Sequence, residues 1–298
     1  MLGLMQDRFD ISSLKGVRVH SDYEGSVAAS LPDGGAGEVS AAAIAATLAY
    51  NVSVETGGRD DVIVFLRPHV ALALLDPEEA SFAPAVGLVL AQLARLGTGT
   101  LLADVFSRDP ATWADTDRML VGQALPAWQT FVLESYASMS DPDRRVRAVD
   151  LLVEALHGLK DRLAPVRRAF WSHRDFDRLL GEMLPIAADV LSVAAAAAAA
   201  VPELAPAARE IFEARLERLE HRRWFDLLRA DLASIWSEGD RYPTPDAFLA
   251  LRGHMERLLV HGAIFLWDEQ GAWRVQVPFW ADPDLLAAGA LHDGSDGT

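Results

Sequence analysis

The stretch from Thr244 to Trp280 reads TPDAFLALRGHMERLLVHGAIFLWDEQGAWRVQVPFW, and it carries the most definite structural pattern of the chain. Its first half predicts a helix over residues 246–261. Two short β runs follow, joined by Asp268-Glu269-Gln270-Gly271, a polar turn in which the glycine can supply a positive φ. The segment therefore predicts a helix followed at once by a β-hairpin.

Alternation along the two β runs divides the predicted hairpin into two faces. Leu266 falls on one side of the first run, and Phe265 and Trp267 fall on the other. On the return run, Trp273 alternates with Arg274. Both sides of the first run are apolar, so we expect the hairpin to pack against something on each face.

The order of elements in MERLLVHGAIFLWDEQGAWRVQVP resembles the last helix and wing of winged-helix domains. Leu258, Leu259, Gly262 and Ile264 match the apolar helix, the glycine after it and the first wing strand. The likeness spans residues 243–280, roughly an eighth of the chain, and points to no family for the whole protein. It implies a winged-helix-like unit, and such a fold does not by itself fix a function.

The charges of this segment favour a protein partner over DNA. Wings that grip DNA usually present Lys and Arg to phosphates, whereas this turn presents Asp268 and Glu269. In the preceding helix, Arg252 and Arg257 are balanced by acidic residues. Candidate partner-binding residues are Trp267, Asp268, Glu269, Trp273 and Trp280.

Composition restricts the classes of function. The chain has 298 residues, 51% of them hydrophobic and 23% charged, which predicts a globular protein with a substantial core. It contains no cysteine, so disulfides and thiol chemistry are excluded. The net charge of −16 should repel nucleic acid and anionic membranes, and it suits docking on a basic partner.

Nothing at the N-terminus is typical of a secretory signal, and the longest apolar stretch, Ile186–Val201, is short for a membrane span. We therefore expect a cytoplasmic protein without membrane insertion. Its seven-alanine run, 194–200, predicts a helix that other helices approach closely.

The rest of the chain predicts a mainly α protein with a less regular N-terminal part. We expect four regions: residues 1–108, mixed or irregular; 109–239, a helical domain; 240–291, the winged-helix-like unit; and 292–298, a disordered tail. The expected helices are Glu38–Tyr50, Phe82–Leu96 with an end at Gly97, one from Pro110, Leu125–Met139, one from Pro142, Phe176–Val201 either broken or kinked at Pro185, and Ala207–Glu238.

Two patterns could hold a metal. Glu154 and His157 form an E-x-x-H pair, whose side chains share one helix face as in di-iron bundles. His20, Asp22 and Glu24 would share one face of a strand. A second E-x-x-H is missing from the sequence, however, so a helical metalloenzyme is only the third hypothesis.

Motifs of nucleophilic catalysis, phosphate-binding loops and dinucleotide binding are absent from the sequence. We therefore expect a non-catalytic protein–protein interaction subunit or adaptor of a bacterial-type cytosolic assembly, without a cofactor. The alternative is a winged-helix transcriptional regulator, since Arg222, Arg223 and Arg229 lie just before the predicted unit.

Overall fold

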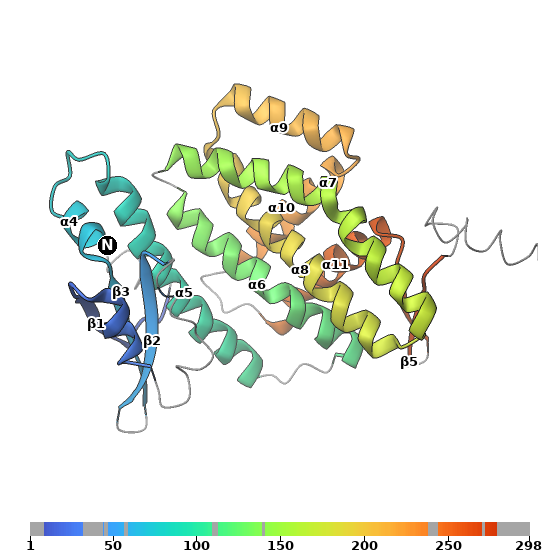
Figure 1. Cartoon of the computed structure of the whole chain (residues 1–298), viewed down its shortest axis with the longest axis horizontal. Coiled ribbons are helices and arrows are strands. Elements are labelled where there is room, and N and C mark those ends of the chain that lie inside the picture. Colours follow the sequence, from blue (N-terminus) through green and yellow to red (C-terminus); the bar gives the residue numbers. More distant parts are fainter. Residues whose placement is uncertain are drawn as a thin grey trace, which may run out of the picture.

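The computed structural model describes residues 9–31, 44, 47–56, 59–108, 113–138, 141–237, 244–269 and 272–278. A small β-sheet lies at one end of the molecule, long helices form its body, and a β-hairpin lies at the opposite end (Figure 1). The prediction of a mainly α protein is confirmed.

The N-terminal sheet has three strands in the order β1-β3-β2. Strand β1 (Leu14–Val19) runs parallel to β3 (Arg59–Leu66), and β2 (Ala49–Thr56) pairs with β3 in antiparallel fashion. The expected helix over Glu38–Tyr50 is wrong at its end, because Ala49 and Tyr50 belong to β2; residues 38–43 lie outside the described residues.

Both faces of β3 are buried, so the strand reads as a continuous apolar run. Ile63 and Phe65 pack with α2 (Tyr23–Ala28), while Val64 and Leu66 pack against the helices on the other face. This burial explains why the apolar run Val62–Leu66 shows no alternation.

The helices follow one another along the chain, and α5 to α8 are the long ones. Their bounds are α4 Pro68–Ala73, α5 Phe82–Arg108, α6 Asp115–Ala137, α7 Pro142–His173, α8 Phe176–Ala200, α9 Pro206–Arg218 and α10 Arg222–Ser237, with a 3₁₀ turn over Val201–Glu203. Helix α9 lies along the outside of α7 (Figure 1).

Helix α8 is the centre of the body and packs against α6, α7, α10 and α11. Ala194, Ala195, Ala197 and Ala200 are fully buried, because their small side chains let neighbouring helices approach closely. A break at Pro185, one of the two predicted effects, is wrong, because α8 continues through this residue; the other, a kink, stays a prediction. The carbonyl that this proline leaves without a donor belongs to exposed Gly181, where water can reach it.

Two other predicted helix ends are also wrong. Helix α5 continues through Gly97 to Arg108, and a Cβ at Gly97 would overlap the ring of Phe9, so this glycine makes room for the N-terminal segment. Helix α6 begins at Asp115 and runs unbroken past Leu125. The predicted start at Pro110 lies outside the described residues.

The prediction for the start of α7 is confirmed. Asp141 is its N-cap, and its carboxylate accepts a hydrogen bond of 2.9 Å from the backbone N–H of Arg144, with Pro142 in the first turn.

The C-terminal elements follow the predicted order. A 3₁₀ turn (Pro245–Phe248) leads into α11 (Leu249–His261), and β4 (Phe265–Glu269) pairs with β5 (Ala272–Gln276). These elements share one hydrophobic cluster with the helical body. The division at residue 240 stays a prediction, and residues 279–298 lie outside the described part.

Two polar contacts tie the start of α6 to the C-terminal elements. The indole Nε1 of Trp113 donates to Asp246 Oδ1 at 2.7 Å, and Arg252 of α11 donates to Asp117 of α6. The 3₁₀ turn and α11, which precede the hairpin, are therefore held on the body by polar and charged contacts as well as by apolar ones.

Candidate functional site

The β4–β5 hairpin has one face on the core and one face in solvent. Leu266, Trp273 and Val275 are half-buried and pack against the main hydrophobic cluster. The opposite side, here called the outer face, consists of the exposed residues Phe265, Trp267, Glu269, Arg274 and Gln276. The predicted alternation is correct, but the expectation that both faces pack is not met within the described residues.

The outer face carries two aromatic side chains in a polar frame. Phe265 pairs across the strands with Gln276, and Trp267 pairs with Arg274. Trp267 is 42% exposed and Phe265 36% exposed, which is unusual for aromatic residues of their size. Arg274 Nε donates to Glu269 Oε2 at 2.7 Å, so the two charges beside Trp267 neutralise each other.

The structure separates the candidate residues that the sequence grouped together. Trp267 and Glu269 lie on the outer face. Trp273 lies on the inner face, with its ring 6.3 Å from that of Phe176 at the start of α8. Trp280 and the side chain of Asp268 lie outside the described residues.

The end of α11 sets the position of the hairpin. Gly262 caps the helix with φ −77°, and Ala263 takes the left-handed conformation, φ 59°. A Cβ on Gly262 would overlap Leu163 of α7, and the guanidinium of Arg167 donates to the carbonyl of Gly262. The glycine is therefore needed for close contact with α7 and not for a left-handed backbone conformation.

Two of the arginines that could contact DNA, Arg252 and Arg222, are paired with carboxylates. Arg252 makes ion pairs with Asp117 and with Glu256, the latter at 2.9 Å. Arg222 at the start of α10 pairs with Asp226 at 2.8 Å and with Glu213 at 2.9 Å. A phosphate backbone would have to displace these carboxylates.

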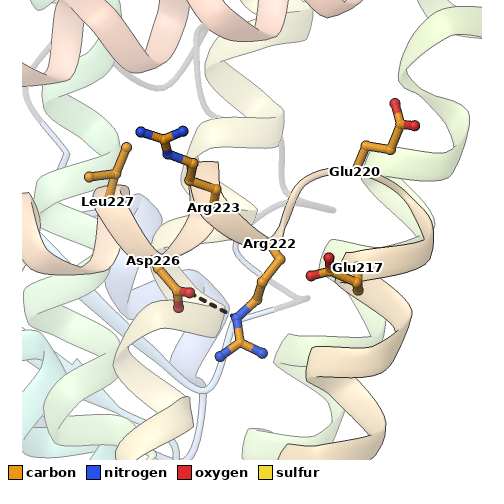
Figure 2. A pocket seen from close by; sticks show the side chains of 6 residues that line it. All are labelled: Glu217, Glu220, Arg222, Arg223, Asp226 and Leu227. Carbon is orange, nitrogen blue, oxygen red and sulfur yellow. Dashed lines mark hydrogen bonds and ion pairs between the residues drawn. The ribbon is translucent and has the colours of Figure 1, made fainter.

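The junction of α9 and α10 carries a charged hollow lined by Glu217, Glu220, Arg222, Arg223, Asp226 and Leu227 (Figure 2). In this view Arg222 turns towards Asp226, and Arg223 and Leu227 lie on the other side of α10. The expected single helix over Ala207–Glu238 is wrong here. Glu220 adopts φ 61°, and the backbone N–H of His221 bonds to Leu216 O, a helix-ending motif in which glycine is usual.

A second hollow of about 400 Å³ adjoins this junction, here called the histidine hollow. It is lined by Leu156, His157, Lys160, Asp161, Arg218, Leu219, Glu220, His221 and His261. Two cations and two carboxylates line it, so with neutral histidines it offers no net charge to an ionic ligand.

The floor of the histidine hollow holds two imidazole rings in contact. The ring centroids of His221 and His261 are 4.0 Å apart, and His221 is only 4% exposed. Burial lowers the pKa of His221 to about 4, with His261 and Lys160 acting in the same direction. Burial and Lys160 also lower the pKa of His261, against the opposing effect of Glu220.

A second buried histidine, His254, lies farther along the interface of α10 and α11. His254 Nε2 is 2.7 Å from Asp231 Oδ2. Burial lowers the pKa of His254, although the Asp231 carboxylate acts in the opposite direction. The ring of Trp224 lies between this pair and His221, with its centroid 6.3 Å from His254 and 5.7 Å from His221.

His254 and His261 are seven residues apart in the sequence, a spacing that places them on one stripe of a helix but does not reveal their partners. His221 and Asp231 lie in a stretch that reads as one continuous helix, because neither glycine nor proline marks the break at Glu220. The seven-residue spacing of His254 and His261 was the one signal in the sequence, and it does not indicate which residues of other elements contact them.

The predicted metal patterns do not assemble into sites within the described part of the chain. His157 is exposed on α7 beside Glu154, and no group of three metal-ligating side chains is found among the described residues. His20, Asp22 and Glu24 do not share a strand face: β1 ends at Val19, Asp22 caps α2, and Glu24 pairs with Arg67 at 2.6 Å.

Two helical segments, Phe82–Ser107 and Phe176–Glu203, are long and apolar enough to cross a membrane by length and composition. Half or more of each is buried inside the protein, and core helices of soluble proteins pass the same test. The absence of membrane insertion stays a prediction.

Comparisons of the chain with protein-family models, with curated proteins and with solved structures find no match.

Proposed function

We propose that this protein is a non-catalytic interaction subunit of a bacterial-type cytosolic assembly, and that it contacts a protein partner through the outer face of the hairpin. The observation that carries the proposal is the exposure of Phe265 and Trp267 on a strand whose other face is packed on the core. An aromatic pair held on a rigid support presents its area to a partner with little loss of conformational freedom.

The chemistry of the outer face suits protein recognition. Tryptophan and arginine are enriched among the residues that dominate binding energy, especially when surrounded by polar groups that exclude water. Here Trp267 is flanked across the strands by Arg274, and the ion pair of Arg274 with Glu269 provides such a polar rim. The acidic charge of the whole chain would speed encounter with a basic partner.

The alternative, a winged-helix regulator that reads DNA, rests on Arg222, Arg223 and Arg229, and the ion pairs of Arg222 weaken it. Arg222 and Arg252, which could have gripped phosphates, are each paired with two carboxylates. We therefore expect nonspecific duplex binding to be weaker than the roughly 10⁻⁴–10⁻⁶ M typical of DNA-binding proteins at physiological salt. Micromolar, salt-sensitive binding in an electrophoretic shift would favour the regulator instead.

The proposal can be tested by capture from native lysate followed by mass spectrometry. The tagged wild-type protein should retain a stoichiometric protein partner, and the Trp267→Ala variant should lose it. Leu75→Ala is a matched control, because Leu75 is 77% exposed but lies after α4, near the sheet. Equal recovery of the partner by wild type and Trp267→Ala would contradict the outer face as the binding surface.

A further inference from the structure

The contact between His221 and His261 joins two separate parts of the chain. His221 belongs to the junction of α9 and α10, and His261 is the last residue of α11, directly before the turn into the hairpin. Their ring centroids are 4.0 Å apart, so the junction holds the end of α11 through these two imidazoles.

The surroundings of the two rings favour neutral imidazole. Lys160 of α7 disfavours a proton on either ring, and Glu220 favours one on His261 only. Asp161 and His157 of α7 and Arg218 of α9 line the same hollow. No hydrogen-bond acceptor for His221 Nε2 is found among the described residues, so a proton added there stays unsatisfied.

We propose that the His221–His261 contact is an acid-sensitive latch, which holds the end of α11 and the hairpin on the body while both rings are neutral and opens when a ring takes up a proton. Opening lets the charged ring reach water and relieves its repulsion from Lys160. His254 at the same interface, faced by Asp231 of α10 and Arg257 of α11, adds to the effect when it is protonated. Acid would thereby withdraw the outer face from its partner, a consequence that rests on the proposed function.

The size of the effect follows from linkage. In the open state His221 would titrate at its ordinary value of 6.5, and in the closed state at about 4. Protonation thus favours opening as the pH falls below 6.5, and the effect levels off near pH 4. Between pH 7 and pH 5, His221 alone should increase the open population roughly 20-fold.

Hydrogen exchange measured by mass spectrometry on the full chain tests the latch directly. After correction for the intrinsic effect of pH, peptides covering 216–224 and 258–269 should lose protection about 20-fold between pH 7 and pH 5. Peptides from α8 should keep their protection. Uniform loss over all helices, or no loss at the latch, would overturn the proposal.

Variants separate the latch from general acid sensitivity. His221→Phe keeps an aromatic ring that cannot titrate, and it should abolish most of the pH dependence at 258–269. His157→Gln, which removes an exposed histidine of the same hollow, should retain it. In case His221→Phe does not fold, an NMR titration of the wild-type histidine Cε1–H signals gives a second readout: a ring that titrates near 6.5 at the His221 position would refute the latch.

These measurements do not depend on a partner. If Trp267→Ala shows the same acid-induced exchange as wild type but no partner is ever captured, the proposed function fails while the latch stands. If a partner binds equally at pH 7 and pH 5 although exchange rises, the latch stands but does not control docking.

Discussion

Single residues at the ends of α9 and α11 show how local conformation positions the hairpin. Both helices end with a left-handed residue that is not glycine, Glu220 at φ 61° and Ala263 at φ 59°. The glycine that the sequence offered as the helix end, Gly262, precedes the left-handed position by one residue. Sequence patterns locate such an end to within a residue or two, but the reason for the glycine, contact with Leu163, depends on a helix about a hundred residues away.

Substitutions at residues 262 and 263 should act in opposite directions. Gly262→Ala forces a methyl group against buried Leu163 and should lower the free energy of unfolding by about 1–3 kcal/mol. Ala263→Gly relieves the left-handed strain and should raise it by about 1 kcal/mol. Urea denaturation of the two variants checks both signs. If Gly262 were needed only for its backbone freedom, Gly262→Ala would be harmless, since its φ of −77° suits alanine.

The partners of His254 and His261 show what a residue pattern in the sequence does not predict. The sequence gives the spacing of His254 and His261, yet Asp231 and His221 face them only because α10 and α11 pack side by side. Tertiary packing brings these residues together, and one sequence without its fold does not reveal such pairs.

At the scale of elements, the sequence predicted the helix start that a local capping interaction determines, but not the helix ends that depend on tertiary contacts. Asp141 accepts a hydrogen bond from a backbone N–H of the first turn, and Pro142 has no N–H that needs a partner. This local capping explains why the start of α7 was predicted correctly. Gly97 and Pro185 usually end helices, but both lie inside one here. At Gly97 the helix packs against Phe9, and at Pro185 the carbonyl left without a donor is exposed to water. The β1–β3 pairing is parallel and non-local, and nothing in the short β1 segment indicates its partner.

Helix α8 allows a test of close packing. Ala195 is fully buried, whereas the adjacent Ala196 is only partly buried. Ala195→Leu inserts methyl groups where no space exists and should lower the free energy of unfolding by about 1–3 kcal/mol. Ala196→Leu is the matched control and should change it less. Equal effects in chemical denaturation would mean that the alanine run is not the close-contact face of the helix.

For the whole molecule, the sequence predicted a mainly helical protein and a two-faced hairpin, but it did not predict how the elements before the hairpin are attached to the body. Trp113–Asp246 and Asp117–Arg252 join residues more than a hundred positions apart, and α11 packs on α6 and α8. The hairpin that carries the outer face thus follows a helix that packs on the body. Of the two tryptophans in the described part of the hairpin, Trp273 packs on the body and Trp267 is exposed, and we propose that Trp267 is the one that contacts a partner.

This division of roles is tested most directly by measuring both stability and affinity for the same two variants, using the partner identified by capture. Trp267→Ala should raise the dissociation constant by roughly 30-fold, equivalent to about 2 kcal/mol of binding free energy, without changing the denaturation midpoint. Trp273→Ala should lower the free energy of unfolding by about 2 kcal/mol, because it removes a half-buried ring from the contact with Phe176. Full affinity in Trp267→Ala, or a loss of stability in that variant equal to the loss in Trp273→Ala, would contradict the claim that the outer face of the hairpin is the binding surface.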